Sequence, residues 1–277
     1  MLHFCEMLPR LEISSEPWHP ARPDGGPVRQ RWLDVEGALV AAGGADVDGW
    51  WMHWPHLATY VFRAAGDVVA HVRAGADRGA VTDSYFRGVL PVVLLAREHE
   101  ALHASGVLHD GHVTAFCAAS GTGKSSLALA VAAQGDDHWA DDTVILATRP
   151  GGLAALSLPF PARVDDDVRA HVQAARHVRA TAAETVAPLR RIYLLVRDAA
   201  VNPRLPTFTD VSGSTGFERL LAHAHPFDLS PAGRRRRMIQ RLMQVAAGAK
   251  ICELRFGPSL DCLPALAARV REHLTAD

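Results

Sequence analysis

The sequence predicts an α/β fold: a phosphate-binding loop (P-loop) domain over residues 98–277, preceded by a small, mostly β domain over residues 1–97. Three observations predict this. From about residue 103, apolar segments of strand length alternate with helix-like segments. A glycine-rich loop, "SGTGKSS" at 120–126, stands between such a strand and a helix. The first 97 residues instead show short apolar runs between clusters of proline and glycine, which is typical of strands joined by turns.

The composition is that of an ordinary globular protein. Of 277 residues, 48% are hydrophobic and 21% charged, which is enough to bury the core of one large domain or two small ones. The net charge of −1 gives no reason to expect nucleic acid or an anionic membrane as a partner. No apolar run approaches the ~20 residues of a membrane helix, and the first residues lack a signal-peptide pattern, so we expect a cytoplasmic protein. The oligomeric state stays open, a homo-oligomer included.

The cysteines and tryptophans indicate packing rather than chemistry. Cys5, Cys117, Cys252 and Cys262 show no C-x-x-C spacing, so we expect free, mostly buried thiols in a reducing compartment. Five of the six tryptophans fall within residues 1–97. We expect them to pack in a core, with a peptide-docking surface as the alternative.

The elements around the loop can be predicted in order. The segment 84–98, "SYFRGVLPVVLLARE", is expected to be a helix that Pro91 kinks or shortens. Apolar runs at 103–109 and 112–120 flank Asp110 and Gly111, a pair that suits the positive φ angles of a tight hairpin turn. The second run leads into the loop and then into an alanine- and leucine-rich helix that ends near Gly135.

Strands and helices continue beyond this helix. A strand is expected over 138–148, "HWADDTVILAT", and others over 190–196 and 250–256. Helices are expected over 217–224, from Ser230 with Pro231 in the first turn, and over 262–274.

The loop at 120–126 has the chemistry of a nucleotide site, because glycines let consecutive backbone N–H groups point inward while the helix start adds partial positive charge. Lys124, one of only two lysines, would bridge the β and γ phosphates of ATP, and Ser125 would offer its hydroxyl to Mg²⁺. The full motif G-x-x-x-x-G-K-[ST] begins with glycine where this chain has Ala118, so a loop of purely structural meaning stays open. The predicted nucleotide-binding residues are Ser120, Gly121, Thr122, Gly123, Lys124, Ser125 and Ser126.

An aspartate pair follows the loop. Asp141 and Asp142 stand within or beside the strand expected at 138–148, which should return next to the loop. Phosphoryl transfer to a hydroxyl needs one carboxylate to accept the proton and another to help hold the metal. We expect the pair to face the phosphates; a turn or a solvated strand end is the alternative.

Residues 102–146, "LHASGVLHDGHVTAFCAASGTGKSSLALAVAAQGDDHWADDTVIL", resemble the catalytic core of the HPr kinase/phosphorylase family and its smaller kinase relatives. The resemblance implies an HPr-kinase/PEP-carboxykinase-like domain that uses ATP and Mg²⁺. It implies Asp141 as the general base acting on a serine hydroxyl, with His103 assisting, and Asp142 and Ser125 as groups that serve Mg²⁺. With Lys124, these are the expected catalytic residues.

This chain departs from the bifunctional members of that family. An "LExRG"-type segment is expected after the aspartates, but residues 155–164 read "ALSLPFPARV". The resemblance therefore implies a kinase without phosphorylase activity, acting on a Ser or Thr of a peptide or protein, such as a precursor peptide in lasso-peptide biosynthesis. A small-molecule hydroxyl kinase and a nucleotide-binding regulatory protein without transfer are the alternatives. ATP is expected, although the residues do not exclude GTP.

A second motif overlaps the first. His99, Glu100, His103, Gly106 and His109 spell H-E-x-x-H-x-x-G-x-x-H, the zinc site of a metalloprotease. That site needs His99 and His103 one turn apart on a helix, whereas 103–109 reads as a hairpin strand. The zinc protease is kept as an alternative to the kinase.

A basic run begins the helix expected after Ser230. We expect it either to meet an anionic partner or to form a solvated face with Met238, Leu242 and Val245 turned inward. The run consists of Arg234, Arg235, Arg236 and Arg237.

Overall fold

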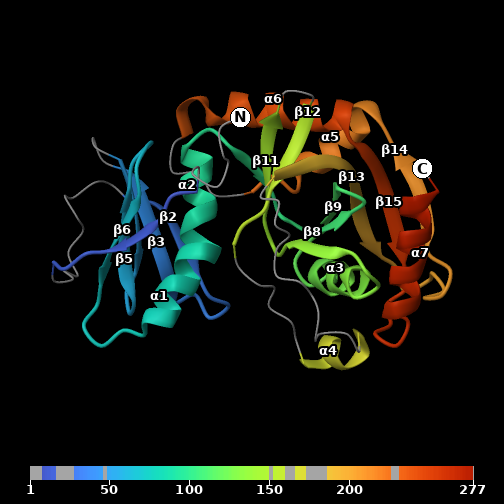
Figure 1. Cartoon of the computed structure of the whole chain (residues 1–277), viewed down its shortest axis with the longest axis horizontal. Coiled ribbons are helices and arrows are strands. Elements are labelled where there is room, and N and C mark those ends of the chain that lie inside the picture. Colours follow the sequence, from blue (N-terminus) through green and yellow to red (C-terminus); the bar gives the residue numbers. More distant parts are fainter. Residues whose placement is uncertain are drawn as a thin grey trace. The chain divides into compact units, whose positions relative to one another are not determined.

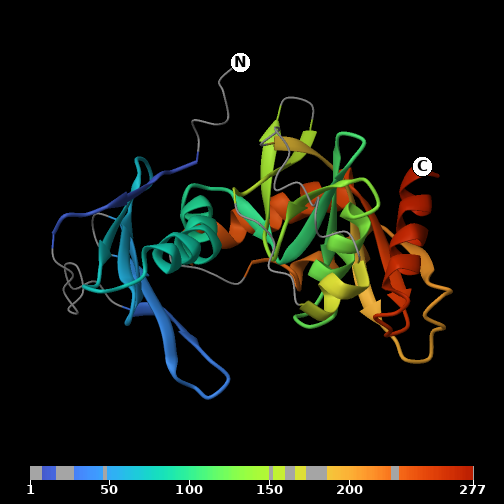
Figure 2. The same cartoon turned by 60° about the horizontal axis from the view of Figure 1, so that its bottom comes forward.

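The computed structural model describes residues 8–16, 28–45, 49–149, 152–159, 166–172, 186–225 and 231–276. It is a mixed α/β structure that divides into two compact units (Figures 1 and 2). One unit comprises Met1–His99 with Pro226–Arg237, and the other Glu100–His225 with Met238–Asp277. The sequence predicted a contiguous division after residue 97, whereas this grouping also assigns Pro226–Arg237 to the first unit. A pattern along the chain carries no information on which distant segments group together.

The first unit is built on a six-stranded sheet in the order β1-β6-β5-β4-β3-β2. Its neighbours pair antiparallel except β1 and β6, which are parallel. The strands are β1 (Leu11–Ile13), β2 (Val28–Leu33), β3 (Leu39–Ala45), β4 (Trp50–Trp54), β5 (Ala58–Phe62) and β6 (Val68–Val72).

Three helical segments follow this sheet without a break: α1 (Arg78–Ser84), η2 (Tyr85–Val89) and α2 (Leu90–Ala96). Pro91 was expected to kink or shorten this helix, and the structure shows that it disturbs the turn before it while the helix continues as α2. The N–H of Leu90 bonds to the carbonyl of Tyr85, five residues back, so the turn before Pro91 is a π turn. A wider turn accommodates the proline ring, which lacks an N–H and crowds the preceding turn of an α-helix.

The tryptophans described in this unit pack as expected in part. Trp51 is buried, and Trp54 meets the ring of Tyr60 edge to face at a centroid distance of 5.4 Å. The Tyr60 hydroxyl donates to the carbonyl of Val81 in α1 over 2.8 Å, which fastens the helix to the sheet. Trp18 lies outside the described residues.

The second unit contains a nine-stranded sheet, in the order β10-β8-β9-β13-β12-β11-β7, with β15 beside β13 and β14 beside β15. Strand β13 is parallel to β9 and β15, and the remaining pairs are antiparallel. The strands are β7 (Glu100–Leu102), β8 (Ala104–His109), β9 (His112–Cys117), β10 (Asp137–Ala140), β11 (Val144–Arg149), β12 (Gly152–Leu156), β13 (Val186–Arg197), β14 (Thr207–Val211) and β15 (Lys250–Phe256).

Helices cover both faces of this sheet (Figure 1). On one face, α3 (Lys124–Ala132), α4 (Asp166–Val172) and α7 (Leu263–Thr275) pack in a core that contains Phe116 and Tyr193. On the other, α5 (Gly213–Leu221) and α6 (Pro231–Gly248) pack against Ile192 and Leu194. Successive residues of β13 thus enter opposite cores, as the alternation of side chains along a strand requires.

The expected hairpin is confirmed, with φ of 46° at Asp110 and 74° at Gly111 between β8 and β9. The strand expected over 138–148 is wrong, because it is two strands: β10 pairs with β8, and β11 pairs with β7 and β12. The chain turns at Asp142, whose φ is 65°. Hydrophobic periodicity cannot reveal one residue in the left-handed region. Strands β12 and β14 and helix α4 were not expected.

Three of the four cysteines lie within the described residues. Cys117, Cys252 and Cys262 are free, and burial raises the pKa of the Cys117 thiol to about 12, which keeps it protonated and unreactive. Cys5 lies outside the described residues. Among the described helices, none has both the length and the apolar character needed to cross a bilayer.

Candidate phosphate-binding site

The loop between β9 and α3 has the backbone of an anion cradle. Gly121 and Gly123 have φ angles of 77° and 110°, values that favour glycine. A Cβ added at either would meet no atom within 4 Å, so the space over the loop is open. Gly123 is the N-cap of α3 and no side chain caps this helix start, which leaves its first turn facing the loop. The residues around these glycines therefore fit a bound phosphate.

The alanine in place of the first motif glycine does not prevent this conformation. Ala118 is not one of the non-glycine residues with positive φ among those described. Its side chain is 2% exposed and belongs to the same core as Leu127 of α3. A methyl group at this position packs the end of β9 against the helix, and the loop turns only after it.

A lysine, a histidine and an aspartate form a chain beside the loop. The Nζ atom of Lys124 lies 3.0 Å from Nε2 of His103 and 3.4 Å from the carbonyl oxygen of Ala119. His103 Nδ1 lies 3.2 Å from both the carboxylate Oδ1 and the backbone oxygen of Asp142. An ammonium group can only donate, so His103 Nε2 accepts and its Nδ1–H donates to Asp142. This chain of contacts sets the tautomer of the histidine.

Two opposing effects act on the pKa of Lys124. Its side chain is 6% exposed, and burial lowers the pKa of the ammonium group. The carboxylates of Asp142 and Asp141 oppose this effect. Both aspartates expected to face the phosphates therefore lie close enough to Lys124 to act on its charge.

The two aspartates have different surroundings. Asp141 is 7% exposed, whereas the side chain of Asp142 is 71% exposed. The N–H of Thr143 bonds to the carbonyl of Asp141 over 2.8 Å, which closes the tight turn centred on Asp142. The left-handed backbone of Asp142 thus separates the pair: one carboxylate enters the protein and the other meets His103 near solvent.

A serine that the sequence did not single out supports the loop. Ser105 of β8 is fully buried, and its Oγ lies 3.2 Å from Oγ of Ser125. The only sequence signal was a hydroxyl residue inside an apolar strand. Of the other predicted loop residues, Ser120 and Gly121 are exposed, and Thr122, Gly123 and Ser126 are partly buried.

The zinc-protease alternative is wrong for this structure. Glu100 lies in β7 and His109 in β8, so the helix on which His99 and His103 would share one face does not exist. His109 Nδ1 instead lies 2.7 Å from Oδ1 of Asp136. Within the described parts of the chain, no group of three or more His, Cys, Asp or Glu residues could hold a metal ion.

Two oxygen donors suit Mg²⁺, which binds proteins through one or two side-chain oxygens and takes its other ligands from phosphate and water. These are the hydroxyl of Ser125 at the start of α3 and the exposed carboxylate of Asp142. An ion held in this way needs bound phosphate to complete its shell, so these residues fit Mg²⁺ together with a nucleotide.

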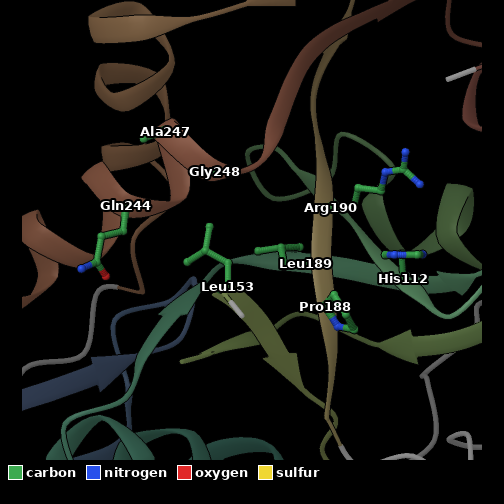
Figure 3. A pocket seen from close by; sticks show the side chains of 9 residues that line it. His112, Leu153, Pro188, Leu189, Arg190, Gln244, Ala247 and Gly248 are labelled. Carbon is green, nitrogen blue, oxygen red and sulfur yellow. The ribbon is translucent and has the colours of Figure 1, made fainter. Parts of the chain in front are cut away.

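A cavity of about 740 Å³ lies elsewhere in the second unit (Figure 3). It opens where β13 leaves β12 after Pro188 and joins β15 at Arg191. Figure 3 shows Arg190 and His112 on one side of β13, with Leu153 and Gln244 on the other. His112 begins β9, whereas the phosphate loop follows the end of that strand. None of the predicted site residues lines this cavity.

The basic run at the start of α6 is not a uniform solvated face. Arg234 is 5% exposed, and Nη1 of Arg237 lies 3.6 Å from a carboxylate oxygen of Glu98. The predicted inward face is confirmed, since Leu242 and Val245 are fully buried and Met238 packs against the same core.

Comparisons with known proteins add little to this geometry. No protein-family model matches the chain, and no curated protein matches it. Among solved structures, it is similar to the Hpr(Ser) kinase/phosphatase from Coxiella burnetii, with a TM-score of 0.36 and 14% sequence identity, over 64% of this chain and 91% of that chain. So distant a likeness carries no argument about function.

Proposed function

We propose that this protein is a kinase that transfers the γ-phosphoryl group of ATP, with Mg²⁺, to a Ser or Thr hydroxyl of a peptide or protein. The observation that carries the proposal is the chain of contacts from Lys124 through His103 to Asp142 beside a loop with two positive-φ glycines. A loop of purely structural meaning gives no reason to place a buried lysine at a helix start within reach of two aspartates from another part of the sheet.

The nucleotide-binding roles follow from the chemistry of each group. The amides of the loop and of the first turn of α3 would bind phosphate oxygens, and Lys124 would bridge the β and γ phosphates. Ser125 and Asp142 would hold Mg²⁺, with Ser105 orienting the Ser125 hydroxyl. The bound Mg²⁺–ATP would supply the phosphoryl group and partly neutralise its charge.

The transfer step needs a group that accepts a proton, and the sequence resemblance of residues 102–146 assigns this role to Asp141. The acceptor oxygen attacks the γ-phosphorus, its proton passes to the Asp141 carboxylate, and the bond to the β–γ bridging oxygen breaks to release ADP. Lys124 neutralises charge on the phosphoryl oxygens, and His103 holds Asp142 in place through its Nδ1–H. Positioning and charge neutralisation thus provide most of the catalysis.

The acceptor is assigned from the sequence resemblance. The smaller kinases that residues 102–146 resemble phosphorylate precursor peptides, so a precursor peptide of natural-product biosynthesis is the first acceptor to test. Small-molecule hydroxyls come second.

The test is mass spectrometry of peptides encoded beside this gene, after incubation with the full chain, ATP and Mg²⁺. The expected result is the gain of one phosphate on a Ser or Thr, absent with the Lys124→Ala variant. Equal product with that variant would contradict the mechanism. Nucleotide binding without transfer to any peptide or small-molecule hydroxyl would favour a regulatory binding protein instead.

A further inference from the structure

A short antiparallel contact brings a second histidine to the phosphate loop. Leu102 pairs with Ala224 as an isolated bridge between β7 and the segment that follows α5. The N–H of His103 donates to the carbonyl of His223 over 2.8 Å, and the N–H of His225 donates to the carbonyl of Ala101 over 2.9 Å. These bonds make His103 and His223 directly opposite partners in the ribbon.

Opposite residues in an antiparallel pair carry their side chains on the same face, with Cβ atoms about 5 Å apart. The ring of His103 reaches Nζ of Lys124 from that face. The ring of His223 therefore starts from the same side of the ribbon, next to the groups assigned to phosphate binding.

The electrostatics of His223 agree with this placement. Burial lowers the pKa of its ring, and the charges of His103, Lys124 and Arg219 lower it further. Arg219 is itself held by Glu253 at 2.6 Å. Among the described residues, no group hydrogen-bonds to the His223 ring, whereas His103 and His109 both have ring partners. A half-buried imidazole in a basic cluster suits a bound anion.

We propose that His223 is a further binding residue of this site, whose ring donates a hydrogen bond to the terminal phosphate of a nucleoside triphosphate beside Lys124. The inference rests on the proposed function, because it takes the loop to bind a nucleotide. A loop lysine bridges the β and γ phosphates, and His223 lies beside His103, whose ring contacts that lysine, so the ring of His223 would meet the terminal phosphate. The residue thus distinguishes a triphosphate from a diphosphate.

The experiment is calorimetric titration of the full chain with ATP and with ADP, each with Mg²⁺. Removal of a hydrogen bond to a charged phosphate should weaken ATP binding about tenfold in His223→Ala and change ADP binding less than about twofold. His223→Gln keeps a donor and should recover part of the loss; it also replaces the alanine variant if that does not fold. His112→Ala, at the far end of β9, is the matched control and should leave both affinities unchanged.

The outcomes separate this inference from the proposed function. Equal loss of ATP and ADP affinity in His223→Ala, or no loss of either, would overturn the role of His223 while leaving the kinase proposal intact. A wild-type chain that binds neither nucleotide would overturn both. If the wild-type chain binds ATP and Lys124→Ala does not, the loop is a nucleotide site. The ratio of ATP affinity to ADP affinity in the His223 variants then decides the inference.

Discussion

The histidine–aspartate pair before β8 can be compared with the pair at the other end of this strand. His103 and Asp142 lie 3.2 Å apart, with side chains 28% and 71% exposed. His109 and Asp136 lie 2.7 Å apart, with side chains 11% and 5% exposed. The first pair has the ammonium of Lys124 as its third member, and the second has the guanidinium of Arg271 in α7, 3.1 Å from Asp136.

The difference teaches how burial decides what one chemical pair does. A buried carboxylate is costly unless it is paired, and Asp136 is paired on both oxygens, so it fastens β8 to α7. An exposed pair contributes little to stability. The pair at His103 therefore adds little to stability, and its position beside the glycine loop agrees with the role in binding and catalysis proposed above.

The largest effect on activity is expected from Lys124→Ala, next to the exposed pair of His103 and Asp142. Loss of the charge that bridges the phosphates should lower the rate of peptide phosphorylation about a thousandfold. Lys250→Ala removes the only other lysine, exposed at the start of β15, and should leave the rate unchanged. Rates are measured by quantifying phosphopeptide over time; a rate in Lys124→Ala within tenfold of wild type would be incompatible with the assignment.

The buried pair of His109 and Asp136 should instead affect the free energy of unfolding. Asp136→Ala leaves His109 and Arg271 without their shared carboxylate, so the free energy of unfolding should fall by about 3 kcal/mol. Asp142→Asn, which removes the charge of the exposed pair but keeps a residue that tolerates the left-handed backbone, should lower it by less than about 1 kcal/mol. Urea denaturation measures both. If the two variants were equally destabilised, burial would not be what distinguishes the pairs.

Replacing each histidine by alanine in turn compares the two pairs further. His103→Ala removes the link between Lys124 and Asp142, and we expect turnover to fall about tenfold, the equivalent of one or two lost hydrogen bonds. In His109→Ala, turnover of the folded fraction should stay within about twofold of wild type. The check is kcat at saturating ATP for both variants. A larger loss in His109→Ala would mean that the far end of β8 takes part in the chemistry.

The smallest effect is expected from the buried serine behind the loop. Ser105→Ala removes the hydrogen bond to Ser125, and the Mg²⁺ concentration for half-maximal rate should rise about fivefold, with kcat at saturating Mg²⁺ unchanged. Ser157→Ala, also buried but bonded to the carbonyl of Trp139, serves as the control. An equal response of the two variants to Mg²⁺ would remove Ser105 from the site.

Several parts of the fold that depend on local chemistry were predictable. The turn at Asp110 and Gly111, the strand over 250–256 and the alanine- and leucine-rich helix after the loop follow from turn residues and apolar runs. The helix begins earlier than its apolar run, at Lys124 inside the predicted loop. The break at Asp142 was not predictable, because an aspartate that turns the chain and one within a strand end look alike in sequence. The π turn before Pro91 was missed for a similar reason, since the pattern shows the disturbance but not how the helix absorbs it.

The candidate site divides in the same way. The sequence by itself determined which groups are available: glycines that turn a loop, one lysine at a helix start, an aspartate pair and several histidines. Only the tertiary structure decided that His103 contacts Lys124 while His109 does not, and that Asp142 is exposed while Asp141 is buried. It also decided that Ser105 contacts Ser125 and that the backbone of His223 pairs with that of His103. The physical reason is that strand pairing and burial join residues far apart in the chain, and these contacts set the charge, tautomer and direction of each group.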